Sequence, residues 1–266
     1  MTRLLHILCA ALALLFFAGC STLVPAPAVP APTPQAAHAA WAAVLATYVD
    51  ERGAVDFQAL AQDRVNLDRY VRYVAEVPLH SLPDGAPRLA HMINAYNALS
   101  MFNVLQSGIP LTHAGWAKLQ FFVLRKLDIA GQVMSLYTFE NDVIRPYTRA
   151  RNEPRVHFAL NCSALSCPVL PRQPFTAAAL DAELERETRA FFARPENFRI
   201  DVTTRTVWLS ELLNFYAEDF VPRPAASLLD YANLHAPQAA PLDFGVRFTP
   251  YDWTVANSRR RRDTVP

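Results

Sequence analysis

Residues 198–220, FRIDVTTRTVWLSELLNFYAEDF, decide the fold class that we predict for this chain. Phe198–Val202 and Thr206–Leu209 are short runs rich in β-branched and aromatic residues, and the three polar residues between them fit a turn. Ser210 is a favourable N-cap for the helical pattern that follows over Glu211–Phe220. A hairpin that runs directly into a helix indicates an α+β architecture, because parallel βαβ units would need strict alternation of strands and helices.

The rest of the chain extends this pattern without a repeat. Apolar residues recur at helical spacing over 57–77, 87–106 and 176–192, the last with Thr176 as its N-cap. Further strand candidates are 126–133, with a turn at Ala130-Gly131, and 155–160. We therefore predict an α+β fold, a single helix-rich domain with short, mainly antiparallel strands.

Composition excludes several classes of protein. Of the 266 residues, 52% are hydrophobic and 18% charged, which is typical of globular proteins. The 25 Lys and Arg against 24 Asp and Glu give a net charge of +1, so the broad basic field of a nucleic-acid binder is absent and no nucleic-acid partner is predicted. With seven glycines and no G-x-G-x-x-G or Walker lysine motif, the sequence predicts no cofactor.

The first twenty residues, MTRLLHILCAALALLFFAGC, are typical of a secretory signal. Arg3 precedes an apolar run over Leu4–Phe17, which is shorter than the roughly 20 residues of a spanning helix. The small pair before Cys20 resembles the bacterial lipoprotein box, in which that cysteine is lipidated. An ordinary cleaved signal and a retained anchor helix remain alternatives. We expect a lipoprotein held at the membrane through Cys20, and Ser21 favours the outer membrane with the domain facing the periplasm.

These segments give the predicted domain organisation. Residues 1–19 are the signal peptide, 20–40 are the lipidated cysteine with an Ala/Pro-rich linker, 41–254 are one globular domain and 255–266 are a basic tail. Within the linker, residues 21–35 read STLVPAPAVPAPTPQ. Proline lacks a backbone N–H and favours extended geometry, so this stretch is expected to be a spacer.

The segment 155–168, RVHFALNCSALSCP, carries the residues best suited to chemistry. If 155–160 is a strand, His157 and Asn161 share one face and point toward the loop that begins at Cys162. Cys162 and Cys167 are the thiols left once Cys9 departs with the signal and Cys20 is acylated. Four alternatives stay open: a disulfide between them, a nucleophilic Cys162 with His157 as base, a zinc site that includes His157, or buried inert thiols.

Four motifs resemble the domain-of-unknown-function 547 family. They are residues 93–99 (INAYNAL), 135–146 (SLYTFENDVIRP), 157–168 (HFALNCSALSCP) and 251–253 (YDW). The resemblance covers about residues 49–253 and implies a protein of the kind found in bacterial envelopes and plants, with no assigned activity. One departure stands out: Glu140 is followed by Asn141 where the family usually has histidine. His157 is then the one histidine in these motifs.

Other motif residues have both structural and functional interpretations. His91, Asn94 and Asn97 form a polar stripe on the helix over 87–106, where the amides either tie loops to the helix or orient a reacting group. Glu140 fits either the first turn of a helix or a buried ion pair with an arginine, Arg145 or Arg155.

Two functions follow. The first is a non-catalytic, periplasm-facing scaffold or binding domain for an unidentified envelope protein or small-molecule ligand. The second is a thiol-dependent hydrolase or acyltransferase that acts on an envelope acyl or amide bond. In it Cys162 is the nucleophile and His157 the base, and Asn94, Asn97 or Glu140 orients them. A Cys162–Cys167 disulfide would remove the nucleophile and so favour the scaffold.

Overall fold

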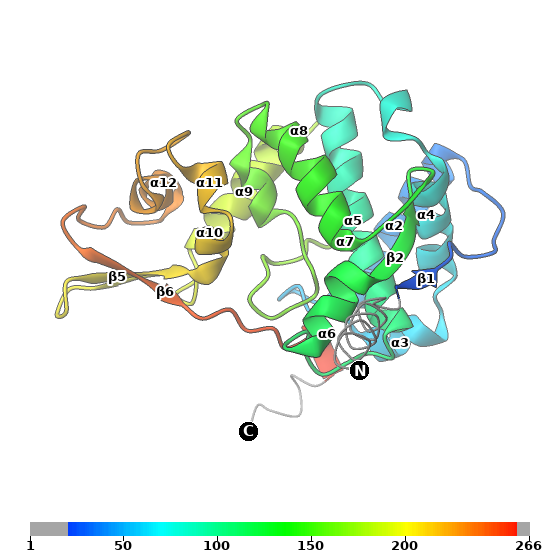
Figure 1. The fold of residues 1–266 in the computed structure, drawn as a ribbon, viewed down its shortest axis with the longest axis horizontal. Coiled ribbons are helices and arrows are strands. Elements are labelled where there is room, and N and C mark those ends of the chain that lie inside the picture. Colours follow the sequence, from blue (N-terminus) through cyan, green and yellow to red (C-terminus); the bar gives the residue numbers. More distant parts are fainter. Residues whose placement is uncertain (1–20, 260–266) are drawn as a thin grey trace, which may run out of the picture.

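The computed structural model describes residues 21–259, shown in Figure 1. The signal peptide 1–19, Cys20 and residues 260–266 of the basic tail lie outside the described residues. Helices dominate, and six short strands form two separate three-stranded sheets within residues 21–259. The predicted α+β single domain is confirmed.

A long central helix, α5 (Ala86–Gln106), organises the larger part of the molecule. Sixteen of its 21 residues are buried, which requires neighbours on all its sides. Among the elements that surround it are α2 (Pro34–Tyr48), α3 (Phe57–Gln62) and α4 (Val65–Glu76) (Figure 1). This arrangement confirms the predicted helix over 87–106 and shows it to be the centre of the main core.

Each of the two sheets combines an antiparallel hairpin with one parallel strand. In the first, β2 (Arg125–Ile129) and β3 (Gln132–Met134) form an antiparallel hairpin, and β1 (Thr22–Val24) adds in parallel beside β2. In the second, β4 (Phe198–Asp201) and β5 (Thr206–Ser210) form the hairpin, and β6 (Gly245–Thr249) adds in parallel beside β5. Both predicted hairpins are present, but each third strand is parallel, so the sheets are mixed.

Short helical elements connect these parts. They are 3₁₀ turns η1 (Leu79–Ser81) and η4 (Pro154–Phe158), π turns η2 (Gln120–Leu124) and η3 (Phe139–Ile144), and the α-helices α6 (Trp116–Leu119), α7 (Leu136–Thr138), α8 (Arg145–Arg149), α9 (Leu180–Phe192), α10 (Glu211–Phe215), α11 (Ala217–Phe220) and α12 (Leu228–His235). π turns inside longer helices occur frequently at functional sites.

Four predicted elements need correction. Residues 155–160 are not a strand, because Pro154 starts a 3₁₀ turn in which Ala159 N–H donates to Val156 O. The helix expected from Thr176 begins at Leu180, since the Thr176 N–H and hydroxyl both bond the Glu183 carboxylate instead. The helix expected over 57–77 is interrupted between Gln62 and Val65. The helix over 211–220 is likewise broken at Tyr216.

The folded body is longer at both ends than predicted. Residues 22–24 precede the first linker proline and keep their N–H groups, so they pair with β2. Helix α2 starts at Pro34, where proline costs no helical bond, and Thr33 caps it by accepting from Ala36 N–H. At the other end, residues 255–258 are buried, and Val255 and Asn257 form β-bridges to the body. The expected 41–254 boundary is therefore too narrow.

Two hydrophobic clusters meet at η4. The larger surrounds α5, whereas the smaller gathers Phe158, Phe192, Phe220 and Tyr231 between α9, α11 and α12. Within η4, Val156 packs in the first cluster and Phe158 in the second. The loop that follows η4 carries both cysteines, which belong to the larger cluster, and Leu212 of the smaller cluster lines the same pocket.

Candidate thiol site

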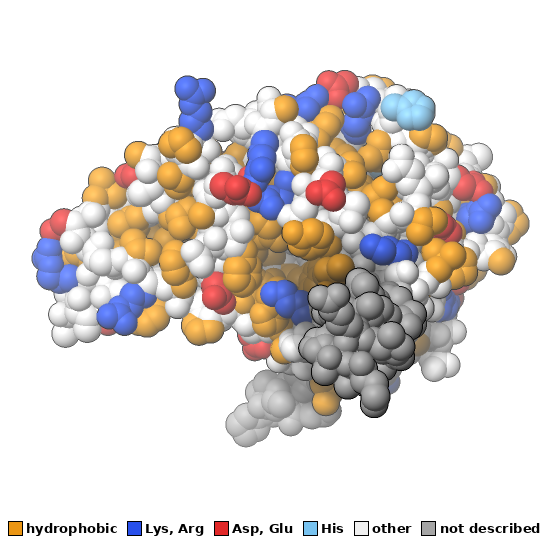
Figure 2. All heavy atoms as spheres, in the orientation of Figure 1, with side chains coloured by type: hydrophobic (Ala, Val, Ile, Leu, Met, Phe, Trp, Pro, Cys, Tyr) orange, Lys and Arg blue, Asp and Glu red, His pale blue; other side chains and the backbone are white. Residues whose placement is uncertain are grey.

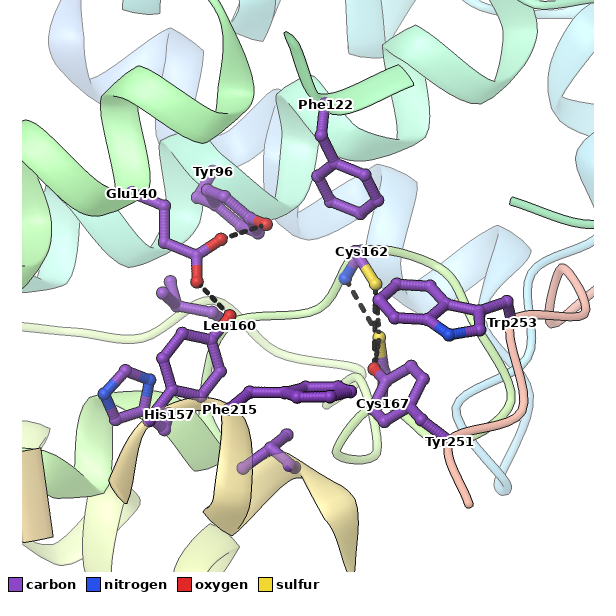
Figure 3. Close-up of a pocket in the computed structure, with 12 residues that line it drawn as sticks. Tyr96, Phe122, Glu140, His157, Leu160, Cys162, Cys167, Phe215, Tyr251 and Trp253 are labelled. Carbon is purple, nitrogen blue, oxygen red and sulfur yellow. Dashed lines mark hydrogen bonds between the residues drawn. The ribbon is translucent and has the colours of Figure 1, made fainter. Parts of the chain in front are cut away.

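The two cysteines face each other at the bottom of a pocket (Figure 3). Both are free and buried, and their Sγ atoms lie 2.9 Å apart. The Cys162 N–H donates to the Cys167 Sγ at 3.1 Å, and the Tyr251 hydroxyl donates to the same sulfur at 3.1 Å. Cys167 therefore accepts two hydrogen bonds besides its contact with the Cys162 thiol, and this sulfur is the more favourable place for a negative charge.

The pair is electrostatically asymmetric. Burial alone would raise the pKa of Cys167, but hydrogen bonds from the Cys162 thiol and the Tyr251 hydroxyl outweigh it and lower the pKa. The hydrogen bond that Cys162 makes to Cys167, together with burial, raises the pKa of Cys162 well above its ordinary value. These hydrogen bonds therefore favour the proton on Cys162 over the proton on Cys167.

Asn97 holds the loop that carries the thiols. Its Nδ2 donates to Ala159 O at 3.0 Å and its Oδ1 accepts from Asn161 N–H at 2.8 Å. The Asn161 side chain continues this bracing, with Nδ2 donating to Pro168 O at 2.7 Å and Oδ1 accepting from Ser163 N–H at 2.7 Å. Asn97 is accordingly a positioning residue that acts through the backbone before Cys162.

Asn94 has a different position. Its amide bonds the backbone of Phe175 in both directions, at 2.7 and 3.0 Å, and its Oδ1 also accepts from the Trp41 indole N–H. It therefore ties the loop before α9 to α5 and α2, and no described contact joins it to the thiols.

Glu140 lies on the wall of the pocket across from Cys162 (Figure 3). The Tyr96 hydroxyl donates to its Oε2 at 2.7 Å, and the Tyr216 hydroxyl donates to its Oε1. Burial and the Glu140 charge raise the pKa of both tyrosines, so both remain donors. Of the two alternatives for Glu140, the ion pair with Arg145 or Arg155 is not found among residues 21–259. Arg145 pairs with Asp219 and Glu218, and Arg155 pairs with Glu153, Asp181 and Glu185.

His157 reaches the pocket but does not reach the sulfurs. Its Nε2 lies 2.7 Å from Asp219 Oδ2, and its ring stacks on Tyr216 with centroids 4.0 Å apart. Burial opposes ionisation of Asp219, but hydrogen bonds from His157 and Arg145 outweigh it and lower the pKa of the carboxyl. Among residues 21–259 no hydrogen bond joins His157 to either thiol. The histidine supports Tyr216, and through it Glu140.

The pocket has an inner and an outer part. The inner cavity measures about 50 Å³ and is mostly apolar, and the two cysteines, Glu140, His157 and three tyrosines are among the residues that line it. A larger cleft of about 510 Å³ adjoins it. Five residues line both: Phe122, Glu140, Phe215, Tyr216 and Trp253. The inner cavity and the cleft are therefore neighbours that share these side chains as walls.

Sequence reasoning missed the tyrosines and Asp219. Tyr96 lies on α5, where periodicity suggested an apolar contact, and Tyr251 was part of a quoted motif without a role. Tyr216 and Asp219 stand in an ordinary amphipathic helix pattern that carries no signal of a site. Tyr216 and Asp219 reach the site because the helix is interrupted at Tyr216, where the Tyr216 ring stacks on His157.

With this geometry in view, one comparison gives a match. Residues 80–192 match the family model for the protein of unknown function DUF547. The DUF547 match contains α5, Glu140, His157 and both cysteines, and it ends with α9. Tyr216, Tyr251 and Trp253 complete the pocket from outside the DUF547 segment. No curated protein and no solved structure matches the chain.

Within residues 21–259, no cluster of three or more His, Cys, Asp or Glu side chains is arranged to hold a metal ion. None of the helices in that part of the chain is long and apolar enough to cross a membrane.

Proposed function

We propose that the protein is a lipid-anchored, periplasm-facing envelope enzyme, a thiol-dependent hydrolase or acyltransferase in which Cys167 is the nucleophile. The observation that carries this proposal is the pair of hydrogen bonds, from Tyr251 and from the Cys162 N–H, that converge on the Cys167 sulfur. The signal pattern and Cys20 support the envelope location.

The paired thiols provide the acid and base that His157 does not supply. The Cys167 thiolate attacks a carbonyl carbon, forming a C–S bond, while the bond to the leaving group breaks and that group takes the Cys162 proton. Water then attacks the thioester and gives a proton to the Cys162 thiolate, and the Cys167 thiolate departs. A second acceptor in place of water gives acyl transfer. Groups whose pKa values are pushed apart suit these separate roles.

Trapping of the acyl-enzyme tests this function. The full chain is incubated with 4-nitrophenyl acetate after reduction, and the adduct is located by peptide mass spectrometry. We expect acetylation at Cys167, its loss in Cys167→Ser, and slower acetylation with a higher pH midpoint in Tyr251→Phe, because that phenol lowers the pKa of Cys167. Thr254→Ala, a change in the same segment, is the matched control. Acetylation confined to Cys162, or none, would contradict the proposal.

A second function, the non-catalytic scaffold, is favoured by one specific observation. The sulfurs are 2.9 Å apart, so a small shift would close a disulfide that locks the loop in an oxidising periplasm. Mass spectrometry of protein alkylated before reduction separates the two functions. A crosslinked Cys162–Cys167 peptide, together with no acetylation after reduction, would support the scaffold.

A further inference from the structure

The cleft outside the thiol pocket has the properties of a ligand site. Its volume of about 510 Å³ lies in the range of pockets for small organic molecules. Its walls are largely aromatic and aliphatic: Leu119, Phe122, Val123, Tyr137, Phe215 and Trp253. In Figure 2, hydrophobic side chains gather in the hollow between α10 and the α6–α7 side. Tyr137 and Phe215 are 51% and 40% exposed, so apolar surface remains uncovered at the rim.

Two cations line this cleft, but they are in different electrostatic states. Arg145 bonds Asp219 Oδ2 at 2.8 Å, Glu218 Oε1 at 2.7 Å and the Asn141 amide oxygen at 2.6 Å, so its charge is compensated. Lys118 forms no ion pair with any residue in the part of the chain that the structure describes. Its ammonium instead lies 3.8 Å from the centre of the Trp253 ring and 5.5 Å from that of Phe215.

Lys118 is also close to the reacting sulfurs. Trp253, on which it rests, packs against Tyr251 with ring centroids 4.4 Å apart, and the Tyr251 hydroxyl bonds Cys167. The Lys118 ammonium, which has no ion-pair partner among the described residues, is therefore connected to Cys167 through the packed rings of Trp253 and Tyr251, and it lies at the edge of an apolar cleft. An anion placed there would form a charge-assisted hydrogen bond beside low-dielectric walls.

We propose that the cleft binds an amphiphilic acyl substrate, with its apolar body against the aromatic walls and an anionic group on Lys118. This inference names the substrate class of the thiol site and so rests on the proposed function. The positive charge selects for the anion, and the apolar walls select for chain or ring length.

Binding is measured with two probes of nearly equal shape. The probes are 4-phenylbutyrate and its neutral isostere 4-phenylbutanamide, titrated into the full chain carrying Cys167→Ser so that no acylation occurs. We expect 4-phenylbutyrate to bind more tightly than the amide. Lys118→Gln should lower the affinity for 4-phenylbutyrate about tenfold, the equivalent of one charge-assisted hydrogen bond, and leave the affinity for the amide unchanged. Lys118→Arg restores the affinity for the anion.

The control is Lys126→Gln, a partly exposed lysine on β2 that does not line the cleft. Equal affinities for the two probes, or equal effects of Lys118→Gln and Lys126→Gln, would overturn the inference. Because the probes bind without the Cys167 nucleophile, anion-selective binding together with failed acetylation would reject the proposed chemistry alone. Normal acetylation of the parent chain without charge selectivity would reject the cleft assignment alone.

Discussion

Asn97 shows how one buried side chain can set the position of a reactive loop. Its amide satisfies both a carbonyl and an N–H of the backbone that leads into Cys162. In Asn97→Ala both backbone groups lose their partner while buried, at a cost of about 1–3 kcal/mol for each group left unsatisfied. We expect a lower free energy of unfolding and faster alkylation of the thiols.

Asn94→Ala is the matched control for Asn97→Ala, because it also removes buried amide hydrogen bonds from α5. It should lower the free energy of unfolding by a similar amount, measured by urea denaturation, and leave the alkylation rate unchanged. If both variants speed alkylation equally, Asn97 does not position the cysteine loop more than Asn94 does.

At the scale of residues, the sequence predicted most of the side chains that lie at the site but not their hydrogen-bond partners. The cysteines, Glu140, His157 and Asn97 were all selected from motifs, and all except Asn97 line one pocket, whose loop Asn97 braces. The predicted pairing of His157 with Cys162 depended on a strand that is in fact a 3₁₀ turn. That turn directs the imidazole to Asp219, which lies 62 residues further along the chain, beyond the reach of any local pattern.

At the scale of elements, substitutions in β1 test whether the segment before α2 contributes to the stability of the folded domain. Val24 is 8% exposed in β1 beside Leu127 of β2, whereas its neighbour Leu23 is 57% exposed. Val24→Ala should lower the free energy of unfolding by about 1–2 kcal/mol, since it removes two buried methyl groups. Leu23→Ala should stay within about 0.5 kcal/mol. Equal effects in thermal denaturation would show that β1 is not docked.

Hairpins and the central helix were predictable because their signals are local. Each hairpin combines alternating apolar residues with a turn, and the helix over 86–106 shows long periodicity. The parallel strands β1 and β6 were not predicted, because the strand that β1 joins lies about a hundred residues away in sequence and the strand that β6 joins lies about forty residues away. Nothing in a short exposed segment such as Gly245–Thr249 specifies which edge it will join.

At the scale of the whole molecule, buried histidines predict acid sensitivity. Burial lowers the pKa of both His91 and His113 to about 4. Between pH 6.5 and 4 the unfolded chain binds protons that the folded protein excludes, so the free energy of unfolding falls as the pH falls. The slope is up to about 1.4 kcal/mol per pH unit for each histidine.

Urea denaturation at pH 5, 6 and 7 measures this slope. His91→Leu should reduce it by about one histidine's share, near 1.4 kcal/mol per pH unit. The exposed His80→Ala should leave it unchanged. A His91→Leu slope identical to that of the parent chain would mean that His91 binds protons as readily in the folded protein as in the unfolded chain.

The segment 245–258 contacts the second sheet, the thiol pocket and the main core. It adds β6 to the second sheet, brings Tyr251 to the Cys167 sulfur and bridges the main core through Val255 and Asn257. During folding the two cysteines can meet across a loop of a few residues, but the phenol that favours a thiolate arrives only after a closure spanning 84 residues. Under the proposed function, assembly order would delay reactivity: a nascent or partly folded chain would hold an ordinary pair of thiols, and the proposed nucleophile would form only with completed tertiary structure.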